Sequence, residues 1–136
     1  MNVLVLCTGN SCRSQMAEGW LRHFGTSEDR ICSAGVRPES VNPKAIAVMK
    51  ESGIDISMHT SDHVDDYIAD SFDHVITVCD NAKDSCPVFP GPTNTIHHSF
   101  SDPAGFVGHD EDVLEGFRKV RDDIRDFCRD FMKPRL

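Results

Sequence analysis

Residues 3–14 read VLVLCTGNSCRS, and this stretch decides the fold of the chain. Its first four residues are all apolar, which is typical of a strand that is buried on both faces in a parallel sheet. Apolar residues then recur at helical spacing from Met16 to Phe24, and Gly25 can end the helix. The stretch therefore predicts a strand, a polar loop that begins at Cys7, and a helix that begins near Arg13.

The same alternation continues along the chain. Short apolar segments predict further strands at residues 31–33, 75–78 and 95–97. Apolar faces predict further helices from Pro43 to Gly53, at residues 61–69, and from Asp110 onward. The pattern predicts an α/β fold with three layers, in which a four-stranded parallel sheet carries helices on both faces. We expect one domain, residues 1–136.

The charge of the chain limits its partners. The 136 residues carry a formal net charge of −8, and the sequence pI is about 5.2. Nucleic acid and anionic membranes are therefore not expected as partners, because the overall field repels them. No apolar run approaches the roughly 20 residues of a membrane-spanning helix. A small anionic substrate is still compatible with this charge, since a site can be positive locally.

The chain contains six cysteines, which is a high number for its length. Residues 1–6 lack the basic start of a secretory signal, so we expect a cytoplasmic protein whose thiols stay reduced. Cysteines in that compartment indicate catalysis, redox chemistry or metal binding rather than structural disulfides.

The loop after the first strand has the composition of an oxyanion-binding site. Gly9 and Asn10 tolerate positive φ, which lets backbone N–H groups curl around an anion. Arg13 can hold two oxygens of a tetrahedral anion with its planar guanidinium. We expect Cys7, at the floor of this positive cup, to be a thiolate that attacks phosphate or a similar anion, with Ser14 hydrogen-bonded to its sulfur. The predicted oxyanion-binding residues are Thr8, Gly9, Asn10, Ser11, Cys12, Arg13 and Ser14.

Other interpretations of this loop are weaker. The spacing of Cys7 and Arg13 alone is not specific, and its position between a strand and a helix is what favours a site. A nucleotide-binding P-loop is disfavoured because no Gly-Lys-Ser/Thr follows. Zinc binding by Cys7 and Cys12 is disfavoured because the chain has no comparable second pair.

Two later cysteines follow the strand predicted at residues 75–78. Cys79 ends that strand, on the same sheet edge as Cys7, and Cys86 follows in a polar loop. Three neighbouring thiols suggest a relay of disulfide exchange, which requires a mobile loop so that Cys86 reaches Cys79. The alternative, that Cys79 fills the core and Cys86 is incidental, is equally open at this point.

The remaining polar candidates have simpler interpretations. Asp102 precedes Pro103 after the last predicted strand and could act as a general acid, although Asp-Pro is also a common turn pair. Cys32 and Cys128 are assigned to the core, and Cys12 is expected to be a bystander. The seven histidines form no metal-ligand pattern.

Together these residues resemble a known family. The chain closely resembles thioredoxin-coupled arsenate reductases, which share the low-molecular-weight tyrosine phosphatase fold. The similar segments are CTGNSCRSQMAEGW (residues 7–20), SAG (33–35), VNPKAI (41–46), IDIS (54–57), HTSD (59–62), the pair Cys79 and Cys86, and DPAG (102–105). The resemblance covers nearly the whole chain and includes three catalytic-type cysteines in order.

The resemblance implies a mechanism. Cys7 attacks arsenate held by the loop and Arg13, and Asp102 protonates the departing hydroxyl. Cys79 then attacks Cys7 and releases arsenite, and Cys86 attacks Cys79. The resulting Cys79–Cys86 disulfide is reduced by thioredoxin. The protein is expected to act as a monomer with no tightly bound cofactor.

The resemblance also implies a cation site beside the loop. Some members of the family hold a potassium ion, and the matching positions in this chain are Asn10, Glu18, Ser33 and Asp62. All four carry oxygen, as a hard cation requires.

Three alternatives stay open. The segment after Asp102 lacks the adjacent aromatic pair with which phosphatases of this fold grip phosphotyrosine, yet a phosphatase needs only Cys7, Arg13 and Asp102. Arsenate reduction could also depend on a low-molecular-weight thiol such as glutathione. A thiol-redox sensor would use the cysteines for signalling rather than for turnover.

Overall fold

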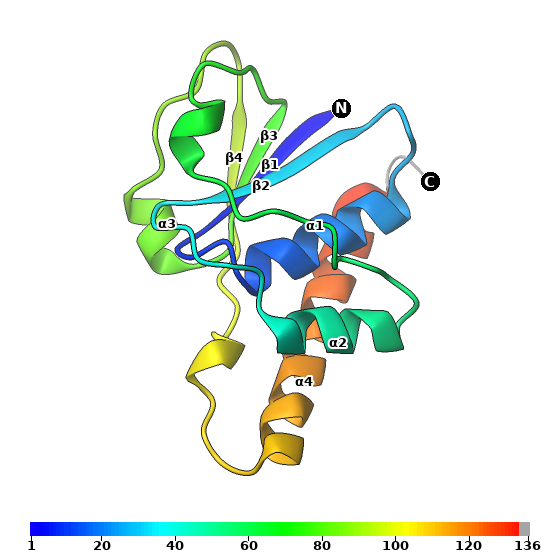
Figure 1. Ribbon diagram of the computed structural model, residues 1–136. Coiled ribbons are helices and arrows are strands. Elements are labelled where there is room, and N and C mark those ends of the chain that lie inside the picture. The colour runs from blue at the N-terminus through cyan, green and yellow to red at the C-terminus, as the bar shows by residue number, and fades with distance from the viewer. Residues whose placement is uncertain (134–136) are drawn as a thin grey trace.

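The computed structural model describes residues 1–133 and alternates strands and helices in the predicted order (Figure 1). The strands are β1 (Asn2–Cys7), β2 (Arg30–Gly35), β3 (His74–Thr77) and β4 (Asn94–His97). The helices are α1 (Arg13–Phe24), α2 (Pro43–Glu51), α3 (Asp80–Asp84) and α4 (Asp110–Met132), with 3₁₀ turns η1 (Val64–Tyr67) and η2 (Pro103–Gly105). No helix within this part of the chain is long and apolar enough to cross a membrane.

The four strands form one parallel sheet in the order β2-β1-β3-β4. The register pairs Cys7 with Gly35 across β1 and β2, and Leu6 with Thr77 across β1 and β3. The carboxyl ends of all four strands therefore lie at one edge of the sheet, and the loops that follow them converge there. This arrangement confirms the predicted fold class.

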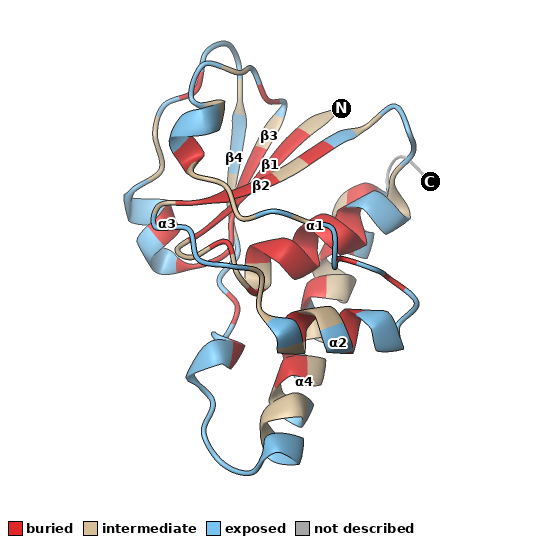
Figure 2. Cartoon of the chain, viewed as in Figure 1, coloured by how far each residue is buried: buried red, intermediate tan, exposed pale blue. Residues whose placement is uncertain are grey.

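Both faces of the sheet are covered. Val3, Leu4, Val5 and Leu6 are fully buried, although alternate side chains of a strand point to opposite faces. Figure 1 shows α1 and α4 on one side of the sheet, with α2 packed outside them, and η1 and α3 on the other side. Figure 2 shows the buried residues along β1, β2 and β3 and along the inner sides of α1 and α4, which form one core, whereas β4 at the edge is more exposed.

The sequence locates most helix ends correctly. Asn42 caps α2 by accepting a hydrogen bond at its Oδ1 from the N–H of Lys44, at 2.8 Å. The helix α1 ends before Gly25, whose N–H donates to the carbonyl of Leu21. The apolar stripe predicted after Asp110 forms α4, and Cys128 on that stripe is fully buried, as expected.

Three predictions about local structure are wrong. The helix predicted at residues 61–69 is reduced to η1, because Val64 is its only fully buried apolar residue and a longer helix would bury little more. The loop after Cys79 is not irregular: its polar residues form α3, with Asp80 in the first turn and Lys83 in the last, where each charge suits the helix dipole. Cys32 is half-buried on the edge strand β2 rather than in the core.

Candidate active site

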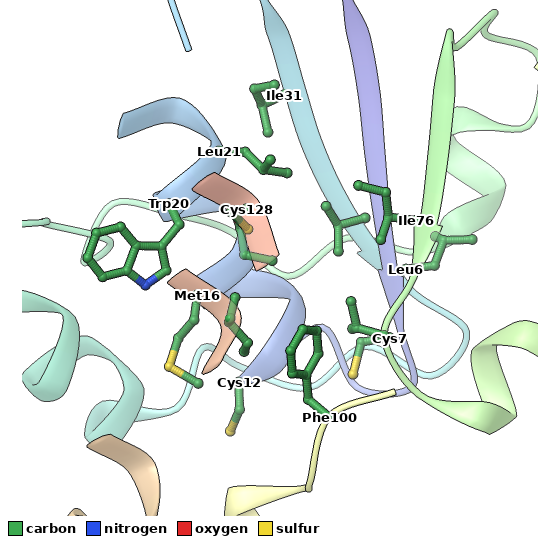
Figure 3. Packing of buried hydrophobic residues seen from close by; sticks show 14 of the residues in the cluster. Leu6, Cys7, Cys12, Met16, Trp20, Leu21, Ile31, Ile76, Phe100 and Cys128 are labelled. Carbon is green, nitrogen blue, oxygen red and sulfur yellow. The ribbon is translucent and has the colours of Figure 1, made fainter. Parts of the chain in front are cut away.

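The loop between β1 and α1 surrounds a cavity of about 350 Å³. The cavity is lined by Cys7, Thr8, Gly9, Ser11, Cys12, Arg13, Arg37, Glu39, Asp102 and Ala104. The lining includes five of the seven predicted oxyanion-binding residues together with Cys7 and Asp102. Figure 3 shows Cys7, Cys12 and Phe100 at one end of the apolar cluster, where the core meets this loop.

Asn10 shapes the loop from behind the cavity. Its φ is 48°, and it is the one non-glycine residue with a positive φ among residues 1–133, whereas Gly9 does not adopt positive φ. Its buried side-chain amide donates to Ser14 Oγ at 2.8 Å and to Ser33 Oγ at 2.9 Å, and its Oδ1 accepts from the N–H of Asp62 at 2.9 Å. These bonds offset the strain of the left-handed conformation and hold the loop in its curled form.

The end of β2 must come very close to this loop. A Cβ atom on Gly35 would lie 2.6 Å from the carbonyl oxygen of Thr8 and 2.9 Å from the backbone nitrogen of Asn10. Only glycine leaves room for this approach. The SAG segment at residues 33–35 therefore supports the loop from its outer side.

Arg13 points its guanidinium toward the cavity and is held from the loop that follows β4. Its Nη1 donates to the carbonyl of Phe100 at 3.0 Å, and its Nη2 lies 3.7 Å from Asp102 Oδ2. Its Nε is buried and has no hydrogen-bond partner in the described part of the chain. Arg13 lines the cavity, so its guanidinium can hold an oxygen of a bound anion, and a small movement that brings Nε to the anion would satisfy this buried donor.

The thiols of Cys7 and Cys79 lie close enough to shift each other's pKa, because Cys7 ends β1 and Cys79 follows the neighbouring strand β3. The bond that Cys7 donates to Cys79, together with burial, raises the pKa of Cys7 above its ordinary value, although Arg13 acts in the opposite direction. In this arrangement Cys79 raises the pKa of Cys7, whereas Arg13 favours the Cys7 thiolate that the sequence predicts. Ser14 Oγ accepts from Asn10, and no hydrogen bond between Ser14 and Cys7 is present among residues 1–133.

Cys79 is surrounded by donors. The hydrogen bond from Cys7 lowers the pKa of Cys79 to about 5, and bonds from Thr8 and from the backbone N–H of Ala82 act in the same direction. Thr8 Oγ1 lies 3.2 Å from Cys79 Sγ. These interactions favour the thiolate form of Cys79, which directly precedes α3.

Cys86 is not in contact with Cys79. Its thiol is half-buried and donates to the carbonyl of Pro87 at 3.6 Å. At about 1.5 Å per residue, the helical segment from Cys79 to Cys86 spans about 10 Å, whereas a disulfide requires Cα atoms within about 7 Å. The helix α3 lies between the two cysteines, so we expect it to unwind when their sulfurs form a bond.

The four positions matched to potassium lie together behind the loop. Ser33 Oγ bridges Asn10 Nδ2 and Glu18 Oε1, at 2.9 and 2.7 Å, and the N–H of Asp62 bonds to Asn10 Oδ1. Glu18 is 7% exposed, and its Oε2 lies 3.0 Å from Arg22 Nε. The group contains one buried carboxylate, but Asn10 presents its NH₂ to Ser33 and Glu18 is paired with Arg22, so a monovalent cation would require these bonds to rearrange.

Several residues at the site were missed from the sequence. Arg37 and Glu39 reach the cavity because they follow β2, which ends beside β1. The predicted parallel topology could have indicated them, since the loops after neighbouring parallel strands meet at one edge of the sheet. Gln15 is fully buried and donates from Nε2 to the carbonyls of Asn10 and Thr60, at 3.0 and 2.9 Å. A polar residue among the apolar positions of α1 could have indicated this role. Asn81 contacts Thr8, and no sequence pattern singled it out.

Known proteins resemble this chain over nearly its whole length. The family model of the low molecular weight phosphotyrosine protein phosphatases matches residues 2–135. A protein of Halalkalibacterium halodurans named arsenate reductase is 48% identical over 122 residues, which cover 90% of this chain and 88% of that protein. A Bacillus subtilis protein that is also named arsenate reductase is 44% identical over 129 residues, which cover 95% of this chain and 93% of that protein.

Solved structures agree with these relatives. A structure described as an arsenate reductase in the phosphate binding state superposes with a TM-score of 0.78 at 35% identity, and the match covers 98% of this chain and 97% of that one. An arginine phosphatase, YwlE, superposes with a TM-score of 0.79 at 22% identity and shares the fold. The sheet, the loop that curls around the cavity and these matches together show that the chain belongs to the low molecular weight phosphotyrosine protein phosphatase family.

Proposed function

We propose that this protein is an arsenate reductase, an oxidoreductase that converts arsenate to arsenite through Cys7, Cys79 and Cys86. The observation that carries the proposal is the contact between Cys7 and the Cys79 thiolate at the floor of an oxyanion cavity. A phosphatase needs one nucleophile, whereas a second sulfur beside the first allows a two-electron reduction. The names of the relatives support the same activity.

In the first step, arsenate binds to the loop and to Arg13, whose buried Nε supplies an unused donor. Cys7 transfers its proton to Cys79, and its sulfur forms a bond to arsenic. The bond from arsenic to one oxygen breaks, and Asp102 protonates that oxygen, which leaves as water. Asp102 is suitably placed because it lines the same cavity and lies beside Arg13.

In the second step, an oxygen of the bound arsenic group accepts the proton from Cys79, which becomes a thiolate again. The Cys79 thiolate attacks the sulfur of Cys7, and the bond from sulfur to arsenic breaks with its electron pair on arsenic. Arsenic is reduced from the +5 to the +3 state and leaves as arsenite, and the two cysteines are oxidised to a disulfide.

In the third step, Cys86 attacks Cys79 and releases Cys7 as a thiol. The new Cys79–Cys86 bond requires α3 to unwind, which exposes the disulfide at the surface. We propose thioredoxin as the dithiol that reduces it. Such a cycle needs a reducing compartment, which favours the cytoplasm, and all of its residues come from one chain, so it requires only a monomer.

We propose that potassium binds behind the loop as a supporting ion. Asn10, Glu18, Ser33 and Asp62 would hold it through oxygen atoms once Asn10 Oδ1 turns from the N–H of Asp62, and its charge would act on the Glu18 carboxylate together with that of Arg22. A bound ion would stiffen the loop through Asn10.

Phosphatase activity is the second candidate, because the family and the loop support it. The structure disfavours a phosphotyrosine substrate, since no aromatic pair borders the cavity. Phe106, the first aromatic residue after Asp102, instead packs on α4, where a Cβ on Gly116 would lie 2.3 Å from its ring. We expect slow hydrolysis of small aryl phosphates.

A coupled assay tests the proposal. Purified protein is incubated with thioredoxin, thioredoxin reductase, NADPH and arsenate, or with glutathione and glutaredoxin in place of the thioredoxin pair. Sustained NADPH consumption that requires arsenate and thioredoxin, and that is lost in Cys79→Ser, supports the relay. Aryl phosphate hydrolysis that is unchanged in Cys79→Ser, without arsenate-dependent turnover, would instead make the protein a phosphatase.

A further inference from the structure

We propose that Asn81 is a positioning residue that fixes the hydroxyl of Thr8 as a hydrogen-bond donor to the sulfur of Cys79. The inference deepens the proposed function, on which it rests, by identifying a residue that prepares the second nucleophile of the relay. Asn81 lies in the first turn of α3, directly after Asp80, and its side chain reaches back to the loop after β1.

The direction of the hydrogen bonds follows from the chemistry of the groups. Asn81 Nδ2 lies 3.2 Å from Thr8 Oγ1, and an amide NH₂ group can only donate. Thr8 Oγ1 must therefore accept this bond. The hydroxyl has one proton, and that proton is free to point at Cys79 Sγ, which lies 3.2 Å away. The oxygen has two lone pairs, so the Asn81 bond favours the donating direction by occupying one of them.

The direction matters because a hydroxyl that donates stabilises a thiolate, whereas one that accepts stabilises the thiol. The Thr8 hydroxyl is the group of residues 1–133 whose hydrogen-bond geometry to Cys79 Sγ is established, so its direction bears directly on the charge of that sulfur. An acceptor in place of the Asn81 amide would draw the Thr8 proton away from the sulfur.

Asn81 is expected to contribute little to the stability of the fold. Its side chain is exposed, and α3 is only five residues long, while Ala82 supplies the buried contact of this helix with the core. Substitution of an exposed polar side chain away from special contacts usually changes the free energy of unfolding by less than about 0.5 kcal/mol. The expected effect of Asn81 is therefore on the chemistry of Cys79.

The test follows the alkylation of Cys79 by iodoacetamide as a function of pH, in the reduced protein without arsenate. Mass spectrometry of the peptide that contains Cys79 separates its labelling from that of the other cysteines. The variants are Asn81→Asp, Asn81→Ala, Thr8→Val and the double variants Thr8→Val/Asn81→Asp and Thr8→Val/Asn81→Ala. Ser85→Ala, an exposed neutral change at the other end of α3, is the matched control.

With Thr8 present, Asn81→Asp is expected to raise the midpoint of Cys79 labelling by about one pH unit or more, and Asn81→Ala by less. In the Thr8→Val background, the two substitutions at Asn81 are expected to raise the midpoint of Cys79 labelling clearly less, because only the direct charge effect of the aspartate remains. Ser85→Ala is expected to leave the midpoint unchanged. Equal shifts in the two backgrounds, or no shift in Asn81→Asp, would overturn the proposal.

The readout separates this inference from the proposed function. Labelling of Cys79 requires no arsenate and no turnover, so a coupling between Asn81 and Thr8 can be found or refuted whatever the assay with thioredoxin shows. If the coupling is present while arsenate turnover is absent, the positioning role stands and the assignment of the reaction falls. If turnover is present without the coupling, only the role of Asn81 is lost.

Discussion

Arg13 Nη2 lies 3.7 Å from Asp102 Oδ2, and this contact joins the loop after β1 to the segment after β4 across the mouth of the cavity. Asp102 is about half exposed, with 53% of its side-chain surface accessible, and its Oδ1 accepts from the N–H of Ala104 at 3.0 Å. A carboxyl group in this position can be presented to an oxygen of an anion that Arg13 holds.

Asp102→Asn is expected to slow arsenate turnover by about 10²–10⁴-fold, because an amide cannot donate a proton to the leaving oxygen. The free energy of unfolding should change by about 1 kcal/mol or less, since a partly exposed ion pair contributes little. Steady-state kinetics and urea denaturation measure the two effects. Asp66→Asn, an exposed change on η1 that does not line the cavity, is the control, and equal losses in both variants would refute a role for Asp102.

Gly35→Ala is expected to weaken the binding of inorganic phosphate and to destabilise the fold by about 1–3 kcal/mol, because the new methyl group collides with the backbone of Thr8 and Asn10. Titration calorimetry and urea denaturation check the two effects. Gly105→Ala is the matched control, since its Cβ would meet no atom within 4 Å. Wild-type phosphate affinity in Gly35→Ala would show that the loop does not depend on this close approach.

Labelling of Cys79 by iodoacetamide is expected to rise with pH around a midpoint of about 5 and to be flat near neutral pH. The sign follows because the thiolate is the reactive form and its fraction grows as the pH passes the pKa. Labelling of Cys7 should begin only at higher pH, because its bond to Cys79 raises its pKa. Reaction of Cys7 before Cys79 as the pH is raised would reverse this assignment of the shared proton.

Cys86→Ser is expected to stop arsenate reduction after about one turnover, because the disulfide between Cys7 and Cys79 can then no longer pass to the surface. Rapid quench followed by arsenite determination gives the amplitude of the burst. Cys32→Ser, on the edge strand β2, should retain multiple turnovers. Continued turnover of Cys86→Ser with thioredoxin would mean that thioredoxin reaches the first disulfide directly.

The oxidised protein offers a second check on this step. The Cys79–Cys86 disulfide is expected to accelerate hydrogen exchange of the α3 amides, since the helix cannot persist when its ends are joined. Exchange within α1 and β1 should stay slow. Unchanged protection of α3 after oxidation would contradict the unwinding.

Much of this protein could be predicted from residues that are close together in the chain. The apolar run of β1, the polar loop after it and the amphipathic pattern of α1 predict both the fold class and an oxyanion site, because strand and helix periodicity are local properties. The stripe of α4 and the cap at Asn42 are local in the same sense. The resemblance carried by residues 7–20 and 102–105 adds the expected order of the cysteines.

Only the tertiary structure decided how the distant residues act on one another. It brings Cys79 close to Cys7, which raises the pKa of Cys7 and lowers that of Cys79, because the proximity of two sulfurs cannot be read from either segment alone. It places Asn81 on Thr8 through the short helix α3, which the polar sequence did not predict. Hydrogen bonds and charge depend on distances of a few ångströms, and these distances are set by the packing of the whole chain.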